Sequence, residues 1–117
     1  MAADIPRPGR QVRGSTAGRP VMALFDLVGR RWVLRVLWEL DRAETPLTFR
    51  ALRAVCGEVS SSVLTRRLHE LTAAGLVEHA DGYVLTTLGR ELVEALQPVT
   101  AWAENWAHVL DADEARP

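Results

Sequence analysis

Residues 59–92 read VSSSVLTRRLHELTAAGLVEHADGYVLTTLGREL, and the fold is decided in this stretch. Leu64, Leu68 and Leu71 recur at steps of four and three residues, which places them on one face of a helix. Ser60 can accept a backbone N–H hydrogen bond in the first turn, and Gly75 can take the left-handed backbone that ends a helix. The pattern predicts a helix over residues 60–74.

A short hairpin is predicted directly after this helix. The segments LVEH (76–79) and YVLT (83–86) alternate around Asp81-Gly82, a pair that favours a tight two-residue turn. Before the helix, FRALRAVC (49–56) has the periodicity of a two-turn helix, and a short turn connects the two. This order predicts a mainly α fold, a winged helix-turn-helix with a short two-stranded wing, whose second helix usually enters the major groove of DNA.

Apolar residues at helical spacing also flank this motif. Residues 22–27 suit a short helix and residues 32–40 a longer one, with Gly29 between them. The last predicted helix runs from Thr87 to about Leu110, and Pro98 inside it should kink it or split it in two. Its apolar stripe is longer than a small core can cover, which favours a homodimer formed through terminal helices.

One domain is expected, since 117 residues, 48% of them hydrophobic, can bury one modest core. We expect a disordered basic arm over residues 1–19, a winged helix-turn-helix domain with a C-terminal dimerisation helix over 20–110, and a tail over 111–117. Two interpretations of the arm stay open: a segment that tracks phosphates or a minor groove, and a solvated start without a partner. The sequence shows neither an apolar run of membrane-spanning length nor a signal-peptide core, so a cytoplasmic location is expected.

The formal net charge of −1 conceals a polarity along the chain. Twelve arginines and six acidic residues precede Leu68, giving +6, whereas two arginines and nine acidic residues lie from Leu68 onward, giving −7. A basic front half and an acidic back half are typical of a DNA-binding module with a separate assembly surface. Chance segregation of charge is the alternative.

The helix over residues 60–74 carries the predicted DNA contacts on its polar face. Direct base readout is assigned to four residues: Ser61, Ser62, Thr65 and Arg66. Among them, Arg66 is the best candidate for a bidentate guanine contact. Phosphate contacts, which fix the register on the duplex, are assigned to three arginines: Arg50, Arg53 and Arg67. The alternative is a solvated polar face without a nucleic-acid partner.

Two further groups of side chains have both a structural and a functional interpretation. Cys56 is either a small buried residue or a redox sensor, and a sensor needs exposure and a lowered pKa. Four tryptophans either pack the core and the dimer interface or line an apolar pocket there for a small aromatic effector: Trp32, Trp38, Trp102 and Trp106.

The sequence gives no sign of a metal site or of catalysis. Its three histidines are too scattered for a local metal site, and its single cysteine excludes an internal disulfide. No serine or cysteine comes with a base and an orienting acid in a known motif. We therefore predict no metal, no cofactor and no enzymatic activity.

Four blocks between Met22 and Trp106 share their order and spacing with one known family: VGRRWVLRVLWEL (28–40), TFRALRAV (48–55), VSSSVLTRRLHELTAAGLVEH (59–79) and YVLTTLGREL (83–92). In these blocks the chain resembles the HxlR-type family of bacterial winged helix-turn-helix transcriptional regulators. The resemblance implies a cytosolic homodimer, built through the first and last helices, that binds near-palindromic operator DNA, and a repressor is expected. It also implies a response to electrophiles, oxidants or small aromatic compounds.

The chain departs from this family pattern in several places. Ser62 and Thr48 stand where the family often has basic residues, which removes one positive contact at each position. The wing is shortened to HADGY (79–83), which has Asp81 at its tip and no arginine. We therefore expect the wing to act as a structural clasp and not to insert into the minor groove. The cysteine that redox-sensing members carry before the first helix is absent. Two alternatives of other classes are a winged-helix protein-interaction module without DNA binding and a small-molecule-binding protein built on the tryptophans.

Overall fold

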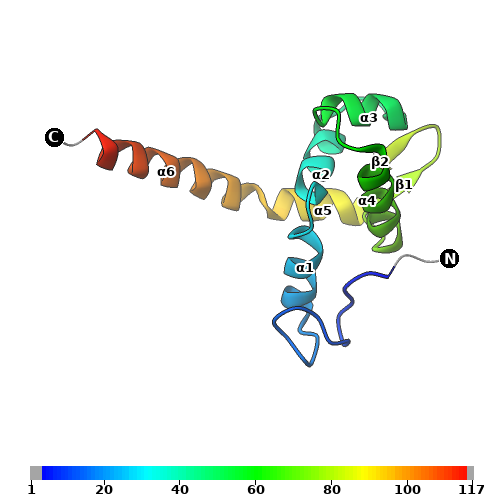
Figure 1. Cartoon of the computed structure of the whole chain (residues 1–117), viewed down its shortest axis with the longest axis horizontal. Coiled ribbons are helices and arrows are strands. Elements are labelled where there is room, and N and C mark those ends of the chain that lie inside the picture. The colour runs from blue at the N-terminus through cyan, green and yellow to red at the C-terminus, as the bar shows by residue number, and fades with distance from the viewer. Residues whose placement is uncertain (1–3, 116–117) are drawn as a thin grey trace.

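The computed structural model describes residues 4–115, along which six helices and one hairpin follow each other (Figure 1). In chain order the elements are α1 (Pro20–Val28), α2 (Val33–Arg42), α3 (Phe49–Val55), α4 (Ser61–Ala73), β1 (Val77–His79), β2 (Tyr83–Leu85), α5 (Thr87–Ala95) and α6 (Gln97–Glu114). A mainly helical fold with a two-stranded wing is therefore confirmed.

Both ends of α4 lie where local chemistry predicts them. The Ser60 hydroxyl accepts a hydrogen bond from Val63 N at 3.5 Å, which caps the first turn. After the last turn, Gly75 has a φ of +79°, a left-handed backbone that glycine adopts without steric cost. The helix predicted over residues 60–74 is confirmed.

The wing is an antiparallel hairpin that is fastened to the rest of the molecule. Its last ladder pair is His79 with Tyr83, so the loop holds three residues, 80–82, in place of the two expected. A 3.0 Å hydrogen bond between the first and last of these residues closes the loop. Tyr83 N also donates to Leu47 O at 2.7 Å, and Leu47 N donates back to Tyr83 O at 3.2 Å. The linker before α3 thus adds one bridge to the sheet.

One apolar cluster joins the first five helices and the hairpin. α2 lies at its centre and contacts α1, α3, α5 and β2. On α4, Leu64, Leu68 and Leu71 are each at most 2% exposed. The leucines that define the helical periodicity therefore hold α4 against the body, which leaves its opposite face to solvent.

The C-terminal segment is divided in two near Pro98, as predicted. α5 ends at Ala95, and Pro98 lies in the first turn of α6, where a missing N–H removes no helical hydrogen bond. α6 projects from the body (Figure 1) and has no buried residue between Gln97 and Glu114. The radius of gyration, 16.2 Å, therefore exceeds the roughly 13 Å of a compact domain of this length. The expected tail is helical as far as Glu114, and residues 116–117 lie outside the described part.

The structure describes the N-terminal segment, for which the composition suggests a disordered basic arm, from residue 4 onward. Residues 4–19 form an irregular, turn-rich segment in which Gly9 N donates to Gly18 O at 2.8 Å. Ile5 is only 9% exposed and borders a hollow beside α1 and the end of α4. The glycines and prolines of this segment supply tight turns, and one apolar side chain anchors it. Residues 1–3 lie outside the described part of the chain.

Between residues 4 and 115, none of the helices combines the length and apolar character that crossing a bilayer requires.

Candidate nucleic-acid interface

The exposed face of α4 gathers the residues predicted to read DNA. Ser61, Ser62, Thr65 and Arg66 are all exposed, and they share this face with His69. The buried leucines of the same helix face the opposite way, so these polar side chains point to solvent together. Their grouping provides a row of hydrogen-bond donors and acceptors suited to base edges.

The turn between α3 and α4 has a defined backbone that Arg53 supports. Gly57 and Glu58 both have positive φ, at 77° and 61°. Arg53 Nε donates to Val59 O at 2.7 Å, and its Nη1 lies 3.6 Å from Glu58 Oε2. Arg53 therefore holds the turn in addition to its predicted phosphate role, whereas Arg50 is exposed.

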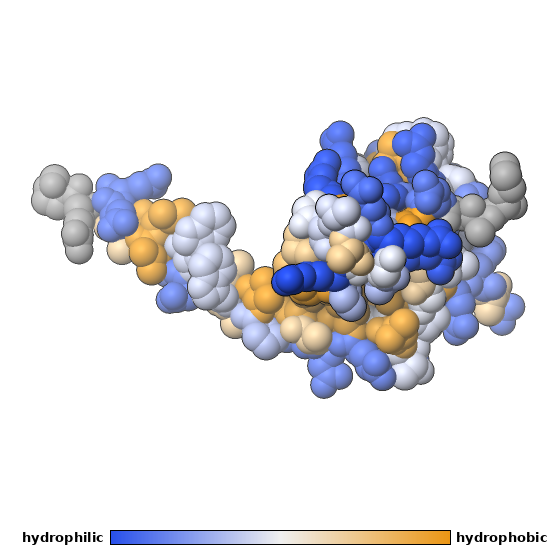
Figure 2. All heavy atoms as spheres, turned by 90° about the horizontal axis from the view of Figure 1, so that it is seen from below, coloured by the Kyte–Doolittle hydropathy of each residue, from blue (hydrophilic) through white to orange (hydrophobic). Residues whose placement is uncertain are grey.

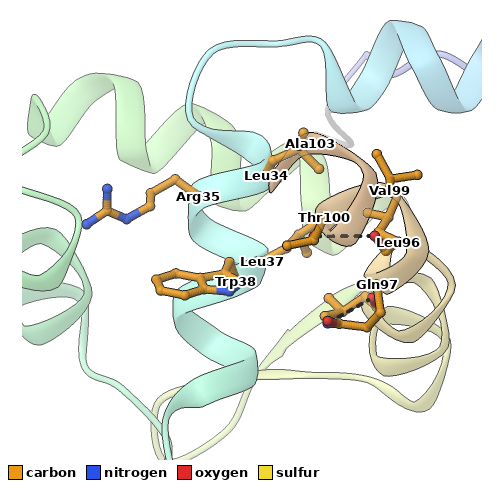
Figure 3. Close-up of a pocket in the computed structure, with 10 residues that line it drawn as sticks. Leu34, Arg35, Leu37, Trp38, Leu96, Gln97, Val99, Thr100 and Ala103 are labelled. Carbon is orange, nitrogen blue, oxygen red and sulfur yellow. Dashed lines mark hydrogen bonds between the residues drawn. The ribbon is translucent and has the colours of Figure 1, made fainter. Parts of the chain in front are cut away.

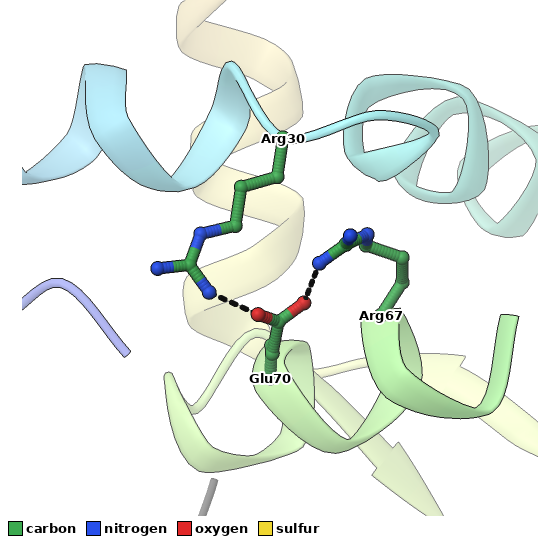
Figure 4. Close-up of polar contacts among 3 residues, drawn as sticks. All are labelled: Arg30, Arg67 and Glu70. Atoms are coloured by element: carbon green, nitrogen blue, oxygen red, sulfur yellow. Dashed lines mark hydrogen bonds and ion pairs between the residues drawn. The ribbon is translucent and has the colours of Figure 1, made fainter. Parts of the chain in front are cut away.

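Arg67 occupies a different place from the one predicted for it. Its side chain is 13% exposed and forms an ion pair with Glu70, which also binds Arg30 (Figure 4). Arg67 follows Leu64 by three residues, so it lies at the edge of the buried face and not on the outer one. The guanidinium of Arg67 is therefore already engaged inside the protein, and this geometry does not support the phosphate contact predicted for it.

The wing is built as a clasp between the helices. The Thr86 hydroxyl donates to Gly75 O at 2.6 Å and accepts from Gly89 N at 3.0 Å, which links the end of α4 to the start of α5. On the hairpin, the rings of His79 and Tyr83 stack with centroids 4.1 Å apart. The sequence interpretation missed this stack, although the hairpin register implied it by placing the two residues opposite each other.

An apolar cavity of about 490 Å³ lies between α2, α5 and α6 (Figure 3). Ten residues line it: Leu34, Arg35, Leu37, Trp38, Val93, Leu96, Gln97, Val99, Thr100 and Ala103. In Figure 2, hydrophobic atoms gather where the projecting helix joins the body and again along that helix. The cavity thus belongs to a larger apolar surface around α6.

The four tryptophans do not converge within one chain. Only Trp38 lines the cavity, with the Arg42 guanidinium 4.5 Å from its ring centroid. Trp32 precedes α2 with a left-handed φ of +77° and packs against the core. Trp102 and Trp106 stack on each other along α6, with centroids 5.7 Å apart, and remain more than half exposed. The predicted four-tryptophan pocket is therefore not formed by a single copy.

Cys56 is buried at the end of α3, with 1% of its surface exposed. Burial raises the pKa of its thiol, the negative charge of Glu39 raises it further, and Arg35 opposes both effects. A sensor thiol needs the reverse conditions, exposure and a lowered pKa. The structure supports the interpretation of Cys56 as a core residue.

Residues 4–115 contain no group of three or more His, Cys, Asp or Glu side chains able to hold a metal ion.

The chain is similar to known helix-turn-helix proteins. A family model described as HxlR-like helix-turn-helix matches residues 27–111. An uncharacterised HTH-type transcriptional regulator of Methanocaldococcus jannaschii is 29% identical over 89 residues, covering 73% of this chain and 83% of that protein. The uncharacterised HTH-type transcriptional regulator YvaP of Bacillus subtilis is 28% identical, covering 69% and 81%.

Two solved structures share the fold. A possible HxlR family transcriptional factor from Thermoplasma volcanium has a TM-score of 0.66 and 26% identity, over 76% of this chain and 85% of that one. The quinone-bound YodB of Bacillus subtilis has a TM-score of 0.68 and 29% identity, over 74% and 97%. Because the family match spans the helix-turn-helix, the wing and most of α6, the chain belongs to the HxlR-like helix-turn-helix family of transcriptional regulators.

Proposed function

We propose that the protein is a cytoplasmic, homodimeric transcriptional repressor that reads a near-palindromic operator with α4. The observation that carries this proposal is the exposed row of Ser61, Ser62, Thr65 and Arg66 on a helix whose other face is fixed in the core. A rigidly held helix with one polar face presents side chains to base edges at little entropic cost.

Each basic residue near α4 has a distinct proposed role. Arg66 is exposed and is proposed to form the bidentate guanine contact. Arg50 is exposed on α3 and is proposed to bind a phosphate. Arg53 contributes mainly by holding the turn, and the engaged Arg67 takes no part in DNA contact.

The dimer is proposed to form through α6 together with α1. Val99, Trp102 and Trp106 are each more than half exposed on α6, and Phe25 of α1 is 56% exposed. Apolar surface of this extent on a terminal helix marks a protein–protein contact. Two α4 helices about 34 Å apart would then reach successive major grooves.

Fluorescence anisotropy with DNA from upstream of the chain's own gene tests DNA recognition. The unaltered protein should bind a duplex from this region in preference to a shuffled one, and affinity should fall steeply with salt. Arg66→Ala should weaken operator binding about tenfold or more, as loss of a bidentate guanine contact does. Arg42→Ala is the matched control, because this arginine lies on α2 against Trp38 and should leave affinity unchanged.

Two outcomes would contradict this assignment. Full operator affinity in Arg66→Ala would exclude α4 as the reading helix in the proposed form. Absence of DNA binding by the unaltered protein would favour a winged-helix interaction module. If the protein is a repressor, transcription of the gene beside the bound site should rise when the protein is absent from the cell.

A ligand-responsive regulator is the second proposal, favoured by the cavity beside α6. We propose that this cavity takes a planar, uncharged aromatic compound, with Trp38 as the stacking partner. The quinone-bound state of the relative YodB supports this class of ligand. Calorimetric titration with 1,4-naphthoquinone should show saturable binding that Trp38→Ala abolishes, while His79→Ala, on the wing and outside the cavity, retains it. Equal binding by both variants would exclude the cavity.

A further inference from the structure

Three charged side chains meet where α4 faces the body (Figure 4). Glu70 Oε2 accepts a hydrogen bond from Arg30 Nη1, and Glu70 Oε1 accepts one from Arg67 Nη1. The exposed fractions of these side chains are 6% for Glu70, 13% for Arg67 and 29% for Arg30. Glu70 and Arg67 both belong to α4, but Arg30 lies 40 residues before Glu70 in the loop between α1 and α2.

The backbone of Arg30 holds the two helices that flank it. Its N–H donates to Leu27 O at the end of α1, and its carbonyl accepts from Val33 N at the start of α2, both at 3.2 Å. Trp32 lies two residues further along this loop. Its left-handed φ of +77° completes the sharp bend between α1 and α2. Arg30 therefore joins α1 and α2 through its backbone and α4 through its side chain.

This junction connects the proposed dimer surface with the reading helix. α1 carries the exposed apolar residues Val21 and Phe25 on one side of the loop. The buried leucines of α4 hold it against the body along one face. A guanidinium–carboxylate pair is directional, and here it ties the orientation of α4 to that of α1.

We propose that Arg30 is a positioning residue for DNA recognition, which transmits the orientation of α1 to α4 through Glu70. The inference rests on the proposed DNA-binding function. Removing the Arg30 side chain leaves Glu70 paired with Arg67, so the fold should persist. Removing the Glu70 carboxylate is more disruptive, because Arg67 loses its partner while its Nε is already buried without a hydrogen bond among the described residues.

The test compares affinities for an upstream duplex and a shuffled duplex of equal length over a range of salt concentrations. Arg30→Met should lower the ratio of the two affinities about fivefold. Its salt dependence should match that of the unaltered protein, because no phosphate contact is lost. Arg30→Lys, which keeps the charge, should retain part of the ratio. Arg31→Met is the matched control, since it removes the exposed neighbouring arginine and should leave the ratio unchanged.

A double-mutant cycle with Glu70→Gln tests the linkage directly. Arg30→Met should cause no further loss in the Glu70→Gln background, and equal losses in both backgrounds would contradict the linkage. A salt slope reduced by about one in Arg30→Met would show a direct phosphate contact and overturn the proposal. If Glu70→Gln does not fold, the Arg30 variants still decide the question.

Different results would overturn the proposed DNA-binding function and the proposed role of Arg30. No DNA binding by the unaltered protein would overturn the proposed function together with this inference. Selective binding by the unaltered protein with an unchanged ratio in Arg30→Met would overturn this inference alone.

Discussion

Cys56 lies in the core beside Glu39 and Arg35, and its surroundings decide its chemistry. Burial raises the pKa of the thiol, so the neutral form is favoured in the folded protein. The folded state then holds this proton more tightly than the unfolded state does. Stability contributed by Cys56 is therefore fully present below the ordinary thiol pKa and is lost as the pH rises through the raised pKa of the folded protein.

We predict that Cys56 reacts slowly with a disulfide reagent in the native protein. At pH 8, 5,5′-dithiobis(2-nitrobenzoic acid) should modify it far more slowly than in the urea-unfolded chain, because both burial and the raised pKa suppress the thiolate. Treatment with a mild oxidant should likewise leave DNA affinity unchanged. Native-state labelling as fast as in urea would show that the thiol is accessible and would revive the sensor interpretation.

At the scale of elements, α5 is joined to the wing at Gly89. A Cβ atom placed there would lie 2.1 Å from Leu76 O, so α5 touches the backbone just before β1. The same carbonyl accepts a hydrogen bond from Thr86 N at 3.0 Å. Thr86 and Gly89 therefore form one junction between α5 and the wing. The threonine caps α5, and the glycine allows α5 to approach the Leu76 backbone closely.

We predict that Gly89→Ala destabilises the protein although alanine is the better helix former. Helix propensity favours alanine by about 1 kcal/mol. The clash with the Leu76 backbone should outweigh this gain and lower the free energy of unfolding by about 2 kcal/mol or more. Urea denaturation followed by circular dichroism measures the change. Glu91→Ala is the control, because Glu91 is exposed on the same helix, and it should change stability by less than about 0.5 kcal/mol. A Gly89→Ala protein more stable than the unaltered one would contradict the close contact.

At the scale of the whole molecule, α6 makes the chain elongated. The extents of the chain are 57 × 38 × 26 Å, and α6 projects from the body (Figure 1). On this helix, Trp102 and Trp106 are 62% and 53% exposed. A helix of 18 residues without a buried side chain gains little from its own chain. A second copy packed on this stripe would bury it, and the cavity beside Trp38 would then border the dimer interface.

We predict that Trp102→Glu and Trp106→Glu produce monomers. Sedimentation equilibrium should give twice the chain mass for the unaltered protein and about the chain mass for each variant, because a buried carboxylate without a partner is strongly unfavourable. Loss of the dimer should also weaken operator binding. His108→Glu adds the same charge on the opposite side of α6 and should remain dimeric. Dimers in both tryptophan variants would place the interface elsewhere.

The sequence by itself determined the elements that depend on interactions between residues close together in the chain. Leu64, Leu68 and Leu71 define the reading helix because their spacing matches the helical repeat, and Ser60 and Gly75 end it through bonds within a few residues. Pro98 divides the C-terminal segment for the same kind of reason, since its missing N–H acts on its own turn. The exposed row on α4 follows directly, because a helix with one buried face leaves the other to solvent.

Only the tertiary structure decided what each long side chain does. Arg67 pairs with Glu70 on its own helix, and Arg30, which lies 40 residues before Glu70, completes that site from another element. The place of Trp38 at the cavity beside α6 has the same origin, because it depends on which distant surfaces meet. Periodicity and capping act over one turn of chain, whereas the partner of a flexible charged or aromatic side chain is set by packing between elements.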